Sequence, residues 1–398
     1  MHKKDHSKIH VGRRDFLKTA SVAGMAVTIP GKSLFRQDPE TTNGWYERLA
    51  NALNKLPNSF PRTKSNIEIS LLKKIFLPEE AFLAGQLTGT PEPVSVIAER
   101  TGLSEEETSS RLKAMMARDF VRGNAAKGMF RLSPFIVGIY ESQLERMDHE
   151  LAHLIEEYFE QGGADIMRPQ PAIHRVIPAQ SAVKTEWILP YDKLKELLLS
   201  CNTFRVRDCI CRKQQELEGT KKCSFPLHVE LIFYTAQAPA DPPVPPYVTK
   251  EEALAVLNET EKIGLVHTVS NVAEGVFYVC NCCGCCCGIL RGITEFGIEK
   301  SVAAANYYSV IDPSKCIGCG TCISRCQMHA ISAKDEISVV DRIKCIGCGL
   351  CASGCPANVA RLERKAKEEI INPPKNYATW EHERLVNRGL VSGPEMKS

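Results

Sequence analysis

The sequence predicts an α+β protein of several domains, and three observations lead to this prediction. Apolar residues recur at helical spacing in the first 160 residues. All 18 cysteines fall between Cys201 and Cys355, among segments with strand and helix patterns. The last third contains an internal repeat of closely spaced cysteines. We expect four parts with the boundaries 1–35, 36–161, 162–300 and 301–366, followed by a C-terminal tail, 367–398.

Composition narrows the class of protein. Of the 398 residues, 43% are hydrophobic, which is enough to build cores. The net charge is only +3, so no global basic field favours nucleic acid or an acidic membrane. Because the cysteines are concentrated in the second half of the chain, we expect a cysteine-dependent function in that half.

Residues 1–35 have the pattern of a targeting segment. A basic start contains "GRRDFLK", and an apolar run, Ala20 to Pro30, follows it. The run is too short for a spanning helix, which needs about 20 residues. The segment resembles a twin-arginine export signal. This resemblance implies transport of a folded, cofactor-loaded protein to the periplasm or the outer face of the cytoplasmic membrane. An uncleaved segment would anchor the chain to the membrane, and a chance basic arm is the alternative.

The part from 36 to 161 begins with a polar linker and a short helix. Further on, "PVSVIAERTGLSEEETSSRLKAMMARDFVRG" predicts helix, turn at Gly102 and helix, with Ser104 as N-cap and Glu107 at the capping-box position. A hairpin is expected around 123–128. The order resembles a winged helix-turn-helix. The second helix opens with three glutamates, which would repel phosphates, so we expect a protein-contact module and no nucleic acid.

A long helix is expected from about Ile136 to Gln161. Its apolar stripe consists of Leu144, Met147, Leu151, Leu154 and Tyr158. The same segment holds "HELAH", His149 to His153, which fits the H-E-x-x-H zinc protease signature. The extended form of that signature is absent, because Glu156 occupies the place of its glycine. We therefore interpret these residues as a solvated helix face.

The strongest motif is the repeat "CIGCGTCISRC" and "CIGCGLCASGCP". Each copy has C-x2-C-x2-C-x3-C spacing, in which three close cysteines wrap one face of a four-iron cluster and the fourth ligates the other cluster. The segment resembles a bacterial two-[4Fe-4S] ferredoxin domain, with Gln327 where the first proline is expected. Zinc ribbons and disulfides are the alternatives. The first predicted ligand set is Cys316, Cys319, Cys322 and Cys355, and the second is Cys345, Cys348, Cys351 and Cys326.

Ten further cysteines lie upstream. Cys201 stands in an apolar helix and is expected to be a buried thiol. The nine others are Cys209, Cys211, Cys223, Cys280, Cys282, Cys283, Cys285, Cys286 and Cys287. Neighbouring thiols cannot bridge one another easily, so we expect one or two additional [4Fe-4S] clusters rather than disulfides. The expected partition joins the first three with one cysteine of the run and gives four others a second site.

The arrangement also resembles a group of bacterial 4Fe-4S binding proteins. The resemblance rests on "RVIP" from Arg175, a C-x-C-R element from Cys209 to Arg212, and an N-C-C-x-C-C-C element from Asn281 to Cys287. It implies iron–sulfur clusters and no defined reaction.

These features predict an exported iron–sulfur electron-transfer protein. Nothing resembles a haem, flavin or dinucleotide site, so we expect a redox protein partner or oxidoreductase subunits that hold the catalytic cofactor. Two alternatives stay open. One is an oxidoreductase in which a cluster with an open iron position binds substrate. The other is a redox-sensing winged-helix regulator.

Overall fold

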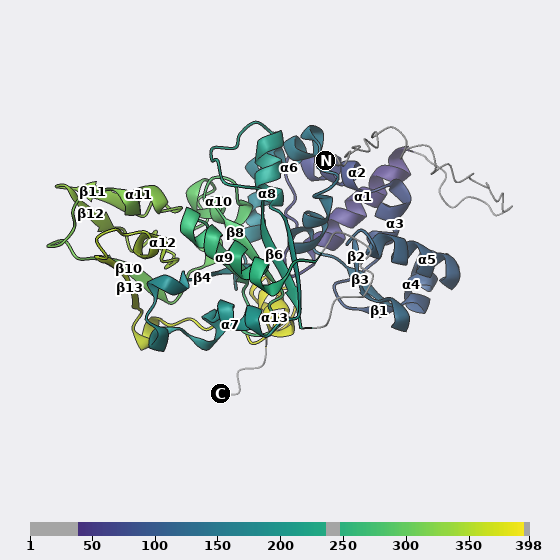
Figure 1. The fold of residues 1–398 in the computed structure, drawn as a ribbon. Helices are drawn as coiled ribbons and strands as arrows, with labels where there is room; N and C mark the ends of the chain where they lie inside the picture. The colour runs from purple at the N-terminus through teal and green to yellow at the C-terminus, as the bar shows by residue number, and fades with distance from the viewer. Residues whose placement is uncertain (1–38, 236–246, 394–398) are drawn as a thin grey trace, which may run out of the picture. The chain divides into compact units, whose positions relative to one another are not determined.

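The computed structural model describes residues 39–235 and 247–393, which belong to one compact unit. The expected export segment lies outside the described residues. None of the described helices is both long and apolar enough to cross a membrane. Figure 1 shows the helices and strands in chain order, from purple to yellow.

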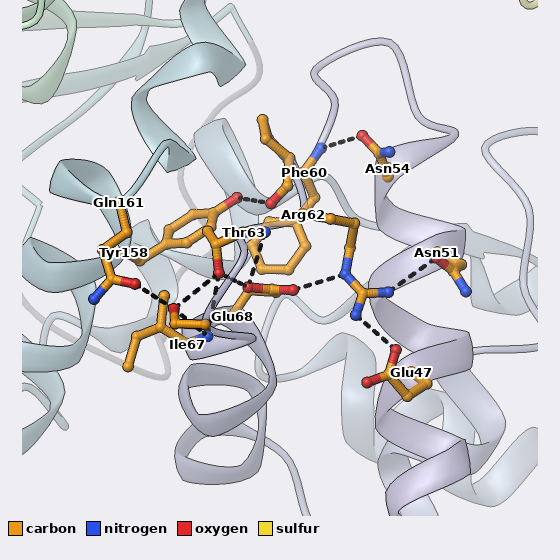
Figure 2. A network of polar contacts seen from close by, with 12 residues as sticks. Glu47, Asn51, Asn54, Phe60, Arg62, Thr63, Ile67, Glu68, Tyr158 and Gln161 are labelled. Carbon is orange, nitrogen blue, oxygen red and sulfur yellow. Dashed lines mark hydrogen bonds and ion pairs between the residues drawn. The ribbon is translucent and has the colours of Figure 1, made fainter.

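Three helices open the described chain: α1 (Pro39–Asn54), α2 (Ile67–Ile75) and α3 (Pro78–Ala84). The buried carboxylate Glu68 of α2 binds the segment before this helix: it pairs with Arg62 at 2.7 Å and accepts from the Thr63 amide at 3.2 Å. Arg62 also reaches Glu47 on α1, as Figure 2 shows. Burial opposes ionisation, but hydrogen bonds from Thr63 and Arg62 hold the pKa of Glu68 below its usual value.

The expected helix–turn–helix and hairpin are present. The elements are α4 (Val94–Thr101), α5 (Glu105–Met116), β2 (Val121–Asn124) and β3 (Met129–Leu132). Ser104 caps α5 by accepting from the Glu107 amide at 3.1 Å. With the short β1 (Glu92–Pro93), the hairpin forms a sheet of order β1-β3-β2. The resemblance to a winged helix stays a prediction from the sequence.

The expected long helix over 136–161 is wrong. The structure has a π-type turn at Phe135–Ile139, a short turn at Glu141–Gln143, and only then α6 (His149–Glu160). The chain restarts because Asp148 caps α6, accepting from the Leu151 amide at 2.8 Å. His149 and His153 are exposed, as expected for a solvated face, and His153 pairs with Glu218 at 3.0 Å.

A six-stranded sheet forms the middle of the unit, with the order β5-β6-β8-β7-β4-β9. Its strands are β4 (His174–Ile177), β5 (Thr203–Asp208), β6 (His228–Tyr234), β7 (Val266–Ser270), β8 (Tyr278–Cys282) and β9 (Val302–Ala303). All neighbours run antiparallel except β4 and β9. Short helices α7 (Leu194–Leu199), α8 (Ile210–Leu217) and α10 (Gly288–Thr294) flank it.

Helix α9 (Lys250–Ile263) packs on β5 and β6, and the expected capping box of Thr249 and Glu252 is present. The core between them includes Leu198, Phe204, Leu231 and Leu257, and Cys201 is buried there as expected, just after α7. This core covers one side of the sheet. The cysteines that follow β5 or lie on β8 are Cys209, Cys280 and Cys282, and they are not part of this core.

The C-terminal cysteine repeat folds around two small antiparallel sheets of two strands each. Strand β10 (Tyr307–Ile311) pairs with β13 (Ala360–Arg364), and β11 (Ile331–Lys334) pairs with β12 (Ile337–Val340). The short helices α11 (Thr321–Arg325) and α12 (Leu350–Ser353) follow the two cysteine loops. Figure 1 shows these elements grouped together.

Residues 367–398, expected as a tail without assigned structure, contain the helix α13 (Tyr377–Asn387). Its Arg384 is fully buried and donates to the carbonyls of Pro57 at 2.9 Å, Pro171 at 2.7 Å and Ile166 at 3.2 Å. This packing has no local signal in the sequence, because the partners are backbone carbonyls far away along the chain.

Candidate metal centres

The structure brings the eight cysteines of the repeat into two separate groups. One small cavity is lined by Cys316, Cys319, Cys322 and Cys355, and we call this the outer quartet. Another is lined by Cys326, Cys345, Cys348 and Cys351, which we call the inner quartet. Each quartet takes three cysteines from one copy of the repeat and the fourth from the other copy. These are the two ligand sets expected from the spacing.

The donor chemistry around both quartets fits a thiolate-bound cluster. The Ala330 amide donates to the Cys326 sulfur at 3.2 Å, and hydroxyls of Ser338 and Ser309 lie 3.1 Å from the sulfurs of Cys322 and Cys351. Backbone amides of Ser338 and Gly318 lower the pKa of Cys316, and the Thr321 hydroxyl lowers that of Cys319. Such donors stabilise the thiolate form that binds iron and help to set a cluster's potential.

Glycine is required where the inner loop approaches a strand. Gly347 has a φ of +70°, and a Cβ there would lie 2.4 Å from the Tyr307 carbonyl oxygen. Only glycine fits both the left-handed backbone and the short approach. The loop between Cys345 and Cys348 therefore lies directly on the beginning of β10.

The two quartets differ in exposure. Cys319 of the outer quartet is exposed, and Ile317 beside it is 68% exposed. Each quartet has one buried cysteine, Cys322 or Cys351, but no cysteine of the inner quartet is exposed, and burial raises the pKa of Cys348 well above its usual value. The carbonyl of Cys348 also accepts from the Ala179 amide, two residues after β4, at 2.8 Å. The outer quartet thus faces solvent, and the inner one lies against the six-stranded sheet domain.

The nine upstream cysteines form two groups, but not in the expected partition. Cys223 lies with Cys283, Cys285 and Cys286, and all four sulfurs are within 4.8 Å of one another. Cys209 and Cys211, expected to share a site with Cys223, instead line a cavity with Cys280, Cys282 and Cys287. We call these the four-thiol group and the five-thiol group. All eighteen cysteines are free thiols.

Local backbone geometry explains this division. Cys280 and Cys282 are two residues apart on β8, so both side chains leave the same face of the strand. The chain then turns through residues 283–286 toward the four-thiol group. Cys287 is the N-cap of α10 and returns to the cavity. Cys223 comes from a segment between α8 and β6 that has no regular structure.

The five thiols form a chain of neighbours in the order Cys209, Cys211, Cys287, Cys282 and Cys280, in which each sulfur interacts with the next. A hydrogen bond with Cys282 favours the Cys280 thiolate, but burial and the charge of Glu230 raise the pKa of Cys280 to about 12. Such buried thiols ionise only when a cation compensates the charge. The donor set therefore fits a metal cluster and exceeds the four ligands of a cubane by one.

The cavity beside the five-thiol group has a volume of about 740 Å³, which exceeds the space that one cluster needs. It also contains polar groups that sequence reasoning missed. Arg207 and Glu230 form an ion pair at 3.1 Å, and Glu141 accepts from the Gly138 amide at 2.6 Å. Burial raises the pKa of Glu141 to about 7. Sequence reasoning missed Arg207 and Glu230 because they lie on two separate strands, β5 and β6, which only the folded sheet brings together.

Arg212, of the C-x-C-R element, stands between the two thiol groups. Its side chain is fully buried and lies near Cys209 and Cys283. The guanidinium donates to the carbonyls of Pro226 and Asn281, and its Nε has no partner among the described residues. Burial works to lower the pKa of Arg212, but the nearby thiolates raise it. A fixed positive charge here stabilises anionic sulfur in both groups.

Gln327 connects the repeat to the cysteine run. Its side-chain oxygen accepts from the Gly284 amide at 2.9 Å, and its side-chain nitrogen donates to the Gly264 carbonyl at 2.9 Å. A proline, expected at this place in a ferredoxin domain, would supply neither contact. Gln327 directly follows Cys326 of the inner quartet, so the four-thiol loop and that quartet are adjacent along this bridge.

No curated protein and no solved structure shows a significant match to this chain. Residues 309–362 match the family model described as a 4Fe-4S dicluster domain. This match covers both quartets and confirms the two-cluster domain expected near the C-terminus. The chain is therefore an iron–sulfur protein with a C-terminal 4Fe-4S dicluster domain and an additional cysteine cluster upstream.

Proposed function

We propose that this protein is an exported electron-transfer protein that exchanges single electrons with a redox partner. The dicluster match over both quartets carries the proposal. A [4Fe-4S] cluster, when bound, gains and loses one electron at a potential that the surrounding hydrogen bonds adjust. The eight cysteines of the outer and inner quartets would hold two such clusters, and the five-thiol group would hold a further one.

The exposure of the cysteines supports different roles for the two quartets, the outer one in docking a partner and the inner one in contact with the rest of the protein. The outer quartet has an exposed cysteine, Cys319, and beside it the exposed apolar side chain of Ile317. Lys315 and Lys344 flank the two loops and are also exposed. We propose that a partner redox protein or oxidoreductase subunit docks here. The inner quartet is adjacent to the sheet domain through Ala179 and to the four-thiol loop through Gln327.

The export route is the second part of the proposal, and it rests on the "GRRDFLK" segment. Assembly of clusters in the cytoplasm before export would keep the thiols reduced and bound. Replacing Arg13 and Arg14 together by lysine should retain the protein in the cytoplasm. Cell fractionation measures this, and a periplasmic double variant would contradict the proposed route.

The first experiment is the iron and acid-labile sulfide content of anaerobically purified protein. About twelve irons per chain are expected, four for each quartet and four for the five-thiol group. Cys209→Ser should remove about four of them, whereas Cys201→Ser, a buried thiol outside both groups, should remove none. About eight irons in the wild-type protein, unchanged by Cys209→Ser, would refute the third cluster.

The large cavity favours a second candidate, an oxidoreductase in which the five-thiol cluster binds substrate. The cavity's space beyond one cluster and its polar groups, Glu141 and Arg207, support it. An open iron position binds a small ligand such as cyanide, so the electron paramagnetic resonance signal that Cys209→Ser abolishes should shift with cyanide. A signal that cyanide leaves unchanged would favour the electron carrier.

A further inference from the structure

The four-thiol group has a geometry of its own. The Cys223 sulfur lies 3.9 Å from that of Cys283 and 3.7 Å from that of Cys286, and the sulfurs of Cys285 and Cys286 are 3.6 Å apart. These distances are too long for a disulfide bond, whose sulfurs are about 2 Å apart. They are also nearly equal, which indicates a common centre rather than one paired contact.

The spacing fits a single ion. Four sulfurs placed tetrahedrally about 2.3 Å from one zinc ion are about 3.8 Å from one another. A four-iron cluster separates its thiolates much more, by roughly 6 Å, because four irons and four sulfides lie between them. Within residues 39–235 and 247–393, neither ferredoxin quartet has its sulfurs as close as the four-thiol group.

The electrostatic surroundings fit a tetrathiolate site. Four thiolates around a divalent cation leave a net charge of about −2. Arg212 lies against Cys283, and Lys221 lies near Cys223 and Cys286. These two cations lie beside a group that would carry this negative charge once a metal is bound.

The position of the group suits a structural role. Cys223 lies in the irregular segment from residue 218 to 227, and the other three lie in the turn between β8 and α10. A metal bound by all four would fix this segment to the turn. All four coordination positions come from the protein, which is the pattern of a structural zinc site. Zinc also imposes no geometric preference of its own, which suits the adjacent pair Cys285 and Cys286.

We propose that Cys223, Cys283, Cys285 and Cys286 bind one structural zinc ion rather than an iron–sulfur cluster. The cysteine run then serves two purposes: Cys280, Cys282 and Cys287 face the redox cavity, and the intervening three hold a metal that does not change oxidation state. This inference does not depend on electron transfer by the dicluster domain.

The test is metal analysis of the full chain purified anaerobically as the cell loads it. We expect one zinc per chain, and X-ray absorption at the zinc edge should give four sulfur neighbours at about 2.3 Å. Cys223→Ser should lose the zinc and keep the wild-type iron content. Cys201→Ser, a buried cysteine outside both groups, should keep both metals.

Several outcomes would overturn the proposal. One is a wild-type protein without zinc, and another is a zinc edge dominated by nitrogen or oxygen neighbours. A loss of about four irons in Cys223→Ser would assign the group to a cubane, and a loss of one iron would assign it to mononuclear iron. The wild-type measurements decide the question even if Cys223→Ser fails to fold.

Discussion

The close approach of the inner cysteine loop to β10 makes a quantitative prediction about Gly347. In Gly347→Ala, the new Cβ would lie 2.4 Å from the Tyr307 carbonyl oxygen and 3.2 Å from that of Ala305. The outer loop supplies a matched control in Gly320. It has a φ of +72°, almost the same as the +70° of Gly347, but a Cβ there meets nothing within 4 Å.

The loss of unfolding free energy in Gly347→Ala has two contributions, one from the backbone conformation and one from the close contact, and the control separates them. A side chain in the left-handed backbone region costs about 1 kcal/mol in both variants. Only Gly347→Ala must also displace a strand carbonyl, and overpacking of this kind costs about 1–3 kcal/mol more. We therefore expect a loss of about 1 kcal/mol for Gly320→Ala and about 2–4 kcal/mol for Gly347→Ala.

The assay is anaerobic urea unfolding of the cluster-loaded protein, followed by the visible absorption of the clusters and by far-ultraviolet circular dichroism. The midpoint should fall further for Gly347→Ala than for Gly320→Ala, with the same dependence on urea concentration. Equal losses in the two variants would refute the argument, because the loop would then not be held against the strand as described.

Three further predictions follow from other contacts. Burial lowers the pKa of His174 from 6.5 to about 4, so as the pH falls the unfolded chain takes up a proton before the folded chain does, and the free energy of unfolding should drop between these pH values. His174→Gln should flatten the slope of the unfolding free energy against pH in this window, and an unchanged slope would exclude His174 as the source of the slope. Gln327→Leu should remove both bridging hydrogen bonds and cost about 1–3 kcal/mol, seen as faster amide hydrogen exchange at Gly284; exchange at the wild-type rate would show that the bridge does not hold the loop. Arg384→Met should cost about 3–5 kcal/mol, because it leaves several buried carbonyls without donors, whereas the exposed Arg361→Met should change the unfolding midpoint little; similar midpoints for the two variants would contradict this.

The dicluster domain was the part most readable from sequence. Its ligands are close along the chain, and the repeat fixes both the spacing and the exchange of the fourth cysteine. The N-cap at Ser104 and the capping box at Thr249 were also predicted, because a helix start depends on residues within one turn. Where the determinants were local, the structure agrees with the expected elements.

The upstream sites could be predicted only in part. The sequence identified the nine cysteines, but the partition depends on a strand face and on a segment without regular structure. The period of two on β8 would have placed Cys280 and Cys282 together, while nothing local marks Cys223 as a partner of the run. The cavity was missed for a similar reason, since its walls come from residues as distant as Glu141 and Phe277.

The wrong prediction of a continuous helix over 136–161 has a different cause. The apolar stripe is real, and four of its five members are buried, but a stripe does not require a continuous helix. Asp148 is a typical N-cap residue and could have been read as the start of a separate helix. The prediction gave more weight to the apolar periodicity than to this residue.

The contacts of Arg384 also bear on how the protein is made. Its partners at Pro57, Ile166 and Pro171 leave the ribosome long before Arg384 does. Until then, these carbonyls lack their final donor, and the two regions that they belong to are not yet joined by α13. Synthesis of the cysteine-rich segments, up to Cys355, is complete before this last helix emerges. A nascent chain therefore carries all of its cysteines before Arg384 can join the first and middle parts of the protein.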